Sequence, residues 1–409
     1  MSALPRVGID IRGLQRGFKS HQGRGIGRYV RSLLEAMLPL DVERRIGFLA
    51  DTDGELDGIG RGGAERLHRI GAPAWLSRLG TQAAHVRQHV YWSRALPALP
   101  FDLFHFCSQT DAPASLDRPY VVTILDLIPH RLPALYLAGK SRVRFFAGRW
   151  LERRALRRAR GLIAISRYTA DDAVRLLGIP RERIVVTPLA VRSGLAPASE
   201  ADVTALCRRH RLRAGYLLYV GGIDRRKNVP FLLEVLRAIV AQRPETELVL
   251  AGRYRDDPDF ADLVLRLKRL GLEDLVRLVG YISEEELAAL YGGAAVFVYP
   301  SLYEGFGLPP LEAMACGAPV VAADRTALPE VLGRAALLVD PREVSEFAEA
   351  ILSLLDHPER RRELVETGLR QASRFSWTAT ARATLEAYRQ FASLPAAIEP
   401  RGEPSPTAR

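Results

Sequence analysis

The stretch YVGGIDRRKNVPFLLEVL, Tyr219 to Leu236, begins as an apolar strand, turns on two glycines, exposes charges and continues as an apolar-periodic helix. The chain has 54 arginines and only four lysines, and one of those lysines, Lys227, lies in this turn. A strand, a glycine turn and a cation before a helix N-terminus form the usual layout of an anion site. The stretch therefore predicts an anion held near Gly221, Gly222, Arg226 and Lys227.

Strand-like runs alternate with helical patterns throughout the chain, which predicts an α/β fold with parallel sheets. The first half holds RVGIDI, RIGFLA, DLFHF, YVVTIL, GLIAIS and RIVVTP, and the second half holds GYLLYVG, ELVLAG, VRLVG, AVFVYP, APVVAA and AALLV. Two similar sets in 409 residues favour two doubly wound domains over one barrel. We expect domains at 1–195 and 196–377, joined through AVRSGLAPASEADV, and a disordered tail at 395–409.

Composition excludes several classes of protein. Apolar residues make up 48% and charged residues 26% of the chain, as in ordinary globular proteins. No apolar run reaches the roughly 18 residues of a membrane span, and the N-terminus lacks a secretory core. Cys107, Cys207 and Cys316 are scattered, without metal-ligand spacing. These features predict a cytoplasmic protein with no disulfide framework and no structural zinc.

The positive charge is concentrated in the first half. Residues 1–200 hold 31 Lys/Arg against 18 Asp/Glu, a net charge of +13, and the remainder is then at −2. This asymmetry indicates an anionic partner, either nucleic acid or an anionic membrane surface, unless it reflects only a general preference for arginine. The basic helix expected at 140–160 carries Phe145, Phe146, Trp150 and Leu151. We expect its apolar stripe to pack on the sheet and its arginines to remain available to the inner membrane face.

The second candidate stretch is EGFGLPPLEAMACGAPVVA, which starts at Glu304. Gly305 and Gly307 leave the backbone open, and two prolines suit the start of a helix. The amides of Phe306, Gly307 and Leu308 could then point at a phosphate or sugar, aided by the helix dipole. Glu304 and Glu312 are placed to accept hydrogen bonds from a polyol, although each alone could be an ordinary loop or first-turn charge.

These motifs resemble those of the GT-B retaining glycosyltransferases of family four. The resemblance rests on EGFGLPPLEAMACGAPVVA and YVGGIDRRKNVPFLLEVL, and on GRGIGRYVRSLL, TILDLIP and the final FSW. It covers about residues 6 to 392. It implies two Rossmann-like domains facing a central cleft, with a helix at about 378–392 that returns to the first domain. It also implies transfer of a hexose, mannose from GDP-mannose being favoured, to a glycan or lipid-linked glycan in cell-surface polysaccharide synthesis, with no metal or cofactor.

The resemblance also implies roles for particular residues. Glu304 would bind the hydroxyls of the donor sugar, and Glu312 those of the ribose. Arg226 and Lys227 would grip the diphosphate and stabilise its charge as the glycosidic bond breaks. Asp126 is the first-half catalytic candidate, and the acceptor-side loop that closes over the donor phosphates contains Gly25, Ile26 and Gly27.

The chain departs from the family pattern at two positions. Gly222 stands where many relatives carry an arginine, and Arg225 is a candidate to compensate. Leu125 replaces a histidine that lies near the anomeric carbon. Because retaining enzymes of this type use the leaving phosphate as the base, this replacement is compatible with transfer.

The sequence favours three other interpretations less. A GT-B nucleotide-sugar epimerase would need a set of Asp, Glu or His residues in the first half to deprotonate a sugar carbon, and none is evident. A basic nucleic-acid-binding protein would need a recognisable module, and none can be identified. The triplet DTD at 51–53 follows a strand, as in metal-dependent GT-A transferases, but nothing around it resembles that fold.

Overall fold

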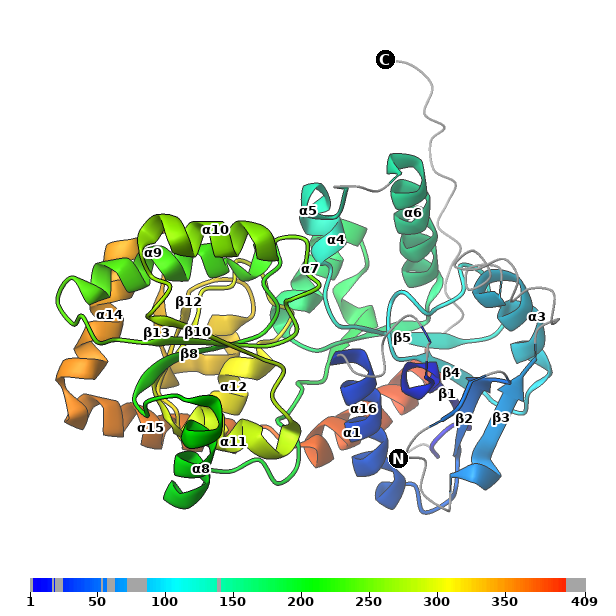
Figure 1. Cartoon of the computed structure of the whole chain (residues 1–409). Coiled ribbons are helices and arrows are strands. Elements are labelled where there is room, and N and C mark those ends of the chain that lie inside the picture. The colour runs from blue at the N-terminus through cyan, green and yellow to red at the C-terminus, as the bar shows by residue number, and fades with distance from the viewer. Residues whose placement is uncertain are drawn as a thin grey trace. The chain divides into compact units, whose positions relative to one another are not determined.

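The computed structural model describes residues 3–16, 18, 25–52, 54–56, 63–71, 87–137 and 141–394. The chain divides into two compact units (Figure 1). Unit 1 comprises Met1–Ile165, Thr169–Thr187 and Thr378–Arg409, and unit 2 comprises Ser166–Tyr168 and Pro188–Trp377. The chain therefore passes from unit 1 to the main part of unit 2 between Thr187 and Pro188, a few residues before the boundary expected from the sequence. The tail at 395–409 lies outside the described residues.

Unit 1 contains a seven-stranded parallel sheet with the order β3-β2-β1-β4-β5-β6-β7. The strands are β1 Val7–Asp10, β2 Ile46–Asp51, β3 Leu67–Ile70, β4 Leu103–Phe106, β5 Tyr120–Ile124, β6 Gly161–Ala164 and β7 Ile184–Val186. The sequence predicted all of them except β3. That strand has only four residues, LHRI, and forms the edge of the sheet, so it lacks the apolar run that marks the buried central strands.

Unit 2 contains a six-stranded parallel sheet with the order β10-β9-β8-β11-β12-β13. The strands are β8 Tyr216–Val220, β9 Leu248–Ala251, β10 Val276–Gly280, β11 Ala294–Tyr299, β12 Val320–Ala323 and β13 Leu337–Val339. All six predicted strands are present. The chain forms β8 first and then adds β9 and β10 on one side of it. It then returns to form β11 on the other side of β8. This reversal is the topological switch point at which doubly wound sheets bind ligands.

Helices connect the parallel strands in both units. Unit 1 has α1 Gly25–Met37, α3 Ser93–Ala95, α4 Ile128–Arg131, α5 Pro133–Leu137, α6 Arg142–Arg158, α7 Arg167–Leu177, which starts in unit 2, and α16 Trp377–Ser393, whose first residue belongs to unit 2. Unit 2 has α8 Glu200–His210, α9 Val229–Val240, α10 Phe260–Leu270, α11 Glu284–Gly292, α12 Leu308–Ala315, α13 Leu328–Leu332, α14 Val344–Asp356 and α15 Pro358–Ala372. In unit 2, α9 and α10 cover one face of the sheet, and α8, α11 and α12 the other (Figure 1).

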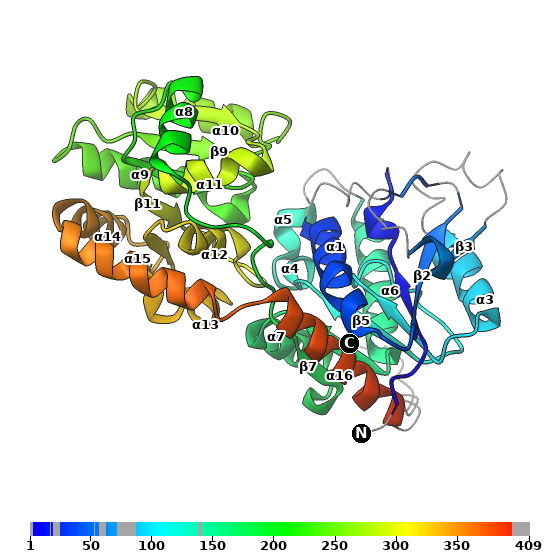
Figure 2. The same ribbon diagram turned by 90° about the horizontal axis from the view of Figure 1, so that it is seen from below.

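A chain of buried polar side chains attaches α16 to the sheet of unit 1. His105 on β4 contacts the Tyr388 hydroxyl through Nδ1 at 2.6 Å and Thr123 through Nε2 at 2.8 Å. The Tyr29 hydroxyl of α1 lies 2.9 Å from the same Thr123. Burial lowers the pKa of His105 to about 3, so the ring is neutral. These contacts, together with the ring of Phe391 beside Gly161, hold α16 within unit 1 (Figure 2).

Helix α6 corrects one expectation from the sequence. Its apolar stripe was expected to pack on the sheet, but Phe146 and Trp150 are 53% and 56% exposed. The buried side chains of α6 are instead Glu152, Ala155 and Leu156. The reason is that α6 has apolar residues on two opposite faces, and the second half of the helix supplies the face that meets the sheet.

Among the residues that the structure describes, none of the helices combines the length and the apolar character needed to cross a membrane.

Candidate active site

The predicted anion-binding residues lie at the carboxyl ends of the two neighbouring strands β8 and β11. The first loop runs from Gly221 through a 3₁₀ turn at Arg225–Lys227, and the second runs from Pro300 to Gly307. Because β8 and β11 pair directly, their loops leave the same edge of the sheet side by side. Residues 77 positions apart in the sequence are thereby brought into contact, as the hydrogen bond from Arg226 Nη1 to the Tyr303 carbonyl shows.

One carboxylate oxygen organises this site. Glu304 Oε1 accepts hydrogen bonds from Lys227 Nζ at 2.7 Å and Arg226 Nη1 at 2.9 Å. It also accepts from the hydroxyls of Ser301 at 2.6 Å and Tyr299 at 3.0 Å. All four groups donate to the same oxygen, Oε1. Within the described part of the chain, no residue donates a hydrogen bond to Glu304 Oε2. Glu304 is thus fixed by one oxygen and can offer the other to a ligand.

The charges of the site are strongly coupled. The side chains of Arg226, Lys227 and Glu304 are only 14%, 12% and 11% exposed. Burial alone would raise the pKa of Glu304, but the neighbouring Lys227 and Arg226 outweigh it and lower that pKa to about 2. Burial lowers the pKa of Lys227, and Glu304 opposes that shift. Glu304 is therefore ionised at neutral pH and neutralises part of a buried cationic pair.

Two tyrosines stack beside the charged groups. The rings of Tyr219 and Tyr299, at the ends of β8 and β11, are 5.9 Å apart with an interplanar angle of 19°. The Lys227 ammonium lies 5.0 Å from the centre of the Tyr299 ring and 2.6 Å from its hydroxyl. Burial and the nearby Glu304 raise the pKa of both tyrosines well above its usual value, so both are neutral donors.

The backbone of the 3₁₀ turn is held in place by the second loop. The Arg226 carbonyl accepts a hydrogen bond from the Leu302 amide at 2.8 Å. Asn228 has a left-handed conformation with a φ of 56°, and its side-chain amide donates to the Pro341 carbonyl at 3.0 Å. Thr326 also has a positive φ of 55°, which is unfavourable for a β-branched residue, and its hydroxyl accepts from the Glu304 amide at 2.9 Å. Asn228 thus supports the cationic turn, and Thr326 supports Glu304.

The glycine turn after β8 makes a close approach to the next strand. Gly221 and Gly252 follow β8 and β9, and both have positive φ values, of 156° and 147°. A Cβ atom on Gly252 would lie 2.0 Å from the Gly221 carbonyl oxygen, which is backbone and cannot rotate away. The two glycines therefore let the loops pack closely enough to set the position of Gly222 and the turn beyond it.

Open backbone donors follow Glu304. Within the described residues, no acceptor takes a hydrogen bond from the amides of Phe306, Gly307 or Leu308. Leu308 begins α12, and the helix N-cap, Gly307, has a φ of 105°. A side chain at 307 would collide with Leu328 at 2.5 Å. The Gly305 carbonyl is fixed by the Ser166 hydroxyl at 2.7 Å. These amides and the dipole of α12 form an anion-binding geometry.

The other predicted residues lie apart from the Glu304 contacts. Glu312 is buried in α12, and its Oε2 accepts from the Tyr291 hydroxyl at 3.2 Å. Arg225 is 73% exposed and lies 3.6 Å from Asp259, as a solvated flank of the turn. In unit 1, Asp126 Oδ1 accepts from the Ile128 amide at 3.1 Å at the start of α4.

Two further predicted features lie in the first half of the chain, at α1 and just after β5. The acceptor-side glycines form the first turn of α1, which begins at Gly25 and buries Gly27 while Ile26 is half-buried. Residues 21–24 of the same motif lie outside the described residues. Leu125, in place of the family histidine, is half-buried, and its amide donates to Gln109 Oε1 at 3.3 Å.

The acidic triplet at 51–53 has a structural contact at its first residue. Asp51 is buried, and its Oδ1 accepts a hydrogen bond from Trp92 Nε1 at 2.8 Å. Asp53 lies outside the described residues. Across the ranges that the structure describes, no cluster of three or more His, Cys, Asp or Glu side chains is arranged to hold a metal ion.

Sequence reasoning missed Tyr299, Ser301 and Thr326. The first two had a detectable signal, because they are polar residues at the carboxyl end of a predicted strand, where ligands bind. Thr326 had none, since its role depends on a left-handed conformation 22 residues beyond Glu304. Unit 1 contains a further unpredicted pair at the end of β1, where the buried side chains of Asp10 and Arg12 are joined at 2.7 Å.

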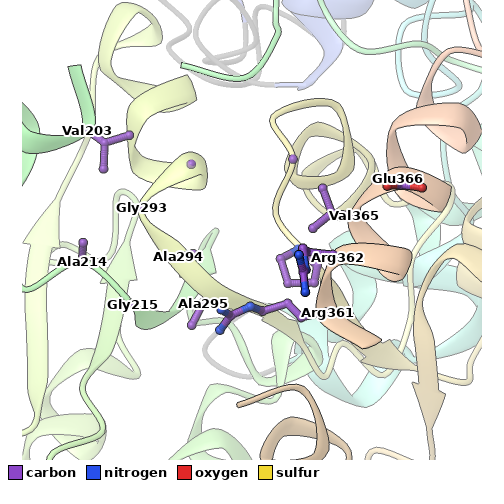
Figure 3. Close-up of a pocket in the computed structure, with 13 residues that line it drawn as sticks. Val203, Ala214, Gly215, Gly293, Ala294, Ala295, Arg361, Arg362, Val365 and Glu366 are labelled. Atoms are coloured by element: carbon purple, nitrogen blue, oxygen red, sulfur yellow. The ribbon is translucent and has the colours of Figure 1, made fainter. Parts of the chain in front are cut away.

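A separate hollow of about 520 Å³ lies at the opposite ends of the unit 2 strands. It is lined by Gly215, Ala294 and Pro319, which stand at the starts of β8, β11 and β12, and by Arg361 and Arg362 of α15 (Figure 3). Ligands of doubly wound sheets bind at the carboxyl ends of the strands instead. None of the predicted donor-binding residues lines this hollow.

Comparison with known proteins agrees with the fold and the motifs. Residues 24–190 match the glycosyl transferase 4-like domain, and residues 209–371 match the glycosyl transferases group 1 domain. The chain is 38% identical over 280 residues to O-antigen chain mannosyltransferase B of Escherichia coli, covering 68% of this chain and 71% of that protein. It is 27% identical over 408 residues to the serotype-specific mannosyltransferase WbdA of Escherichia coli, covering 93% of this chain but only 47% of WbdA.

A solved structure shares the architecture over nearly the whole chain. HepE of Anabaena, crystallised with UDP and glucose, superposes with a TM-score of 0.69, covering 93% of this chain and 98% of HepE. At 18% identity this likeness concerns the fold. The two matching domains and the 38% identical relative establish the family. The chain belongs to the glycosyl transferases group 1 and has the GT-B fold of two Rossmann-like domains.

Proposed function

We propose that this glycosyltransferase moves a mannosyl residue from GDP-mannose to a glycan or lipid-linked glycan acceptor, with retention at the anomeric carbon, during synthesis of a cell-surface polysaccharide. Mannose is supported by the names of the relatives, among them O-antigen chain mannosyltransferase B. The observation that carries the proposal is the buried contact of Arg226 and Lys227 with one oxygen of Glu304 at the β8–β11 switch point.

The arrangement suits the departure of a nucleoside diphosphate. As the bond from the anomeric carbon to the phosphate oxygen breaks, negative charge collects on the diphosphate, and Arg226 and Lys227 lie ready to stabilise it. The amides of Phe306 to Leu308 add neutral donors at the start of α12. The second carboxylate oxygen of Glu304 is available to hydroxyls of the departing sugar. In this mechanism Glu304 positions the sugar while the cations stabilise the leaving group.

Transfer is completed at the same face of the sugar. The acceptor hydroxyl oxygen bonds to the anomeric carbon, and its proton passes to the phosphate oxygen that has just been released. This step needs no protein base, which is consistent with Leu125 in the position of the family histidine. We assign Glu312 to the ribose hydroxyls and Asp126 and the loop at Gly25–Gly27 to the acceptor side of the reaction.

We also propose a cytoplasmic location for the enzyme. Cys107, Cys207 and Cys316 are all buried free thiols. Unpaired cysteines are typical of a reducing compartment, where disulfides are rare.

The donor is identified by a thermal-shift screen of GDP-mannose, GDP, UDP-glucose, ADP-glucose and dTDP-glucose. We expect GDP-mannose and GDP to raise the unfolding temperature most, because a ligand at about 100 times its dissociation constant adds roughly 2.7 kcal/mol to the stability of the folded protein. The donor that gives the largest shift is then tested for transfer to a mannan acceptor. A shift with UDP-glucose and none with GDP-mannose would contradict the donor assignment.

Metal independence is tested by chelation. Because Arg226 and Lys227 supply the positive charge that a divalent ion supplies in other transferases, we expect transfer to continue at an unchanged rate in excess EDTA. The measurement compares initial rates before and after chelation and after addition of Mn²⁺. Loss of activity on chelation, restored by Mn²⁺, would show that the two cations are insufficient.

A further inference from the structure

Helix α6 carries a line of exposed apolar side chains on its outer face. Val143, Phe146 and Trp150 are 79%, 53% and 56% exposed. Their spacing of three and four residues places them within about 60° of one another on an α-helix. We call these three residues the outer stripe. The buried residues Glu152 and Ala155 lie on the opposite side of the helix, so packing within unit 1 does not account for the outer stripe.

Arginines flank the outer stripe on both sides. Helix α6 contains seven arginines and a single acidic residue, Glu152. That carboxylate is buried and lies against Arg149, so it places no negative charge on the outer surface. The Arg154 guanidinium lies 5.8 Å from the centre of the Trp150 ring. Along the described chain, Arg142 and Arg144 have no hydrogen-bond or ion-pair partner for their side chains. The flanks of the outer stripe are therefore uniformly cationic.

The position of α6 in the topology is also informative. β5 ends at Ile124, and the chain then passes through α4 and α5 to the first turn of α6. The first half of α6 therefore lies toward the carboxyl edge of the sheet of unit 1, the edge that carries Asp126.

We propose that the outer stripe of α6 docks unit 1 on an anionic lipid surface. Apolar side chains enter the boundary between headgroups and acyl chains, and the flanking arginines pair with lipid phosphates. A headgroup layer supplies anions on both sides of an inserted stripe, which matches the arginines on both flanks. Because the outer stripe lies in the half of α6 nearest the carboxyl edge of the unit 1 sheet, docking in this way brings that edge close to the membrane.

The test is sedimentation of the full-length chain with vesicles, in the absence of any nucleotide sugar. Because no donor is present, the outcome is independent of the proposed mannosyl transfer. We expect binding at low salt to vesicles of equimolar phosphatidylcholine and phosphatidylglycerol, and little binding to pure phosphatidylcholine. Binding should weaken as salt is added, because surface charges are screened.

Two double variants separate the apolar and the charged contributions. Phe146→Ser with Trp150→Ser removes the inserted rings and should lower the vesicle partition coefficient at least about tenfold. Arg142→Gln with Arg144→Gln should lower it about 30-fold, because each basic residue near an anionic surface contributes about fivefold.

Matched controls come from unit 2. Leu265→Ser with Tyr281→Ser removes two apolar side chains that are 53% and 59% exposed, and Tyr281 also lies under an arginine, Arg253, at 4.5 Å. Lys268→Gln with Arg269→Gln removes the same charge as the arginine variant from the exposed surface of α10. Both controls should bind vesicles like the wild type.

Three results would overturn the proposal. The first is absence of wild-type binding to the anionic vesicles at low salt. The second is equal binding by the wild type and both α6 variants. The third is a wild-type dimer in gel filtration that the serine variant converts to a monomer, since a second copy of the chain would then cover the outer stripe.

Discussion

Lys227→Ala is expected to lower kcat/KM for glycosyl transfer by about a hundredfold to a thousandfold, the usual effect of removing one preorganised group that stabilises transition-state charge. The Lys227 ammonium lies 2.7 Å from Glu304 and is 12% exposed, so little water can replace it. Arg226 remains in the variant and keeps Glu304 partly neutralised, which limits the effect on folding. Initial rates with the identified donor, together with the unfolding temperature, measure the two effects separately.

Arg225→Ala is the matched control for this prediction. Arg225 belongs to the same 3₁₀ turn, but it is 73% exposed and lies 3.6 Å from Asp259, an ion pair of the kind that contributes little. We expect its activity to stay within about twofold of the wild type. If both variants lost the same activity, the turn as a whole would matter and Lys227 would have no special role. Near-wild-type turnover in Lys227→Ala would show that the Lys227 ammonium does not contribute to transfer.

The sequence predicted the charged residues of the site better than the neutral ones. Arg226, Lys227 and Glu304 were identifiable because they follow strands beside glycines, and parallel strands bring such loops to one edge. The order of the strands, which makes β8 and β11 neighbours, was not contained in either motif. Thr326 could not be found, because a positive φ at a threonine is a property of the folded loop.

Helix α6 shows a different limit of sequence reasoning. Its length and position were predictable, but the helix has apolar residues on two faces, with Phe146 and Trp150 on one and Ala155 and Leu156 on the other. Periodicity does not indicate which of these faces is buried. The structure buries the smaller pair. For β3, the pattern LHRI was too short and too polar to be recognised, since an edge strand needs little apolar surface.

Glu304→Gln is expected to impair both transfer and stability. The amide removes the negative charge between Arg226 and Lys227 while both remain buried, and loss of one partner of a buried pair typically costs about 3–5 kcal/mol. The lowered pKa of Glu304, about 2 against an ordinary 4.5, corresponds independently to about 3 kcal/mol. For a domain of this size, that loss lowers the unfolding temperature by about 10 °C at pH 7. Transfer should fall at least a hundredfold or so, as for Lys227→Ala.

The pH dependence of this stability difference follows from the sign of the shift. Because the folded-state pKa of Glu304 is depressed, its stabilising effect is fully present above pH 4.5 and is lost as the pH falls toward 2. The gap in unfolding temperature between the wild type and Glu304→Gln should therefore be constant from pH 7 to 5 and narrow below 4.5. Glu245→Gln is the control, since Glu245 is 88% exposed in its pair with Arg213 and should show no gap at any pH. A gap that persists unchanged at pH 3 would mean that Glu304 acts through its shape and hydrogen bonds, and that its charge does not hold the two cations in place.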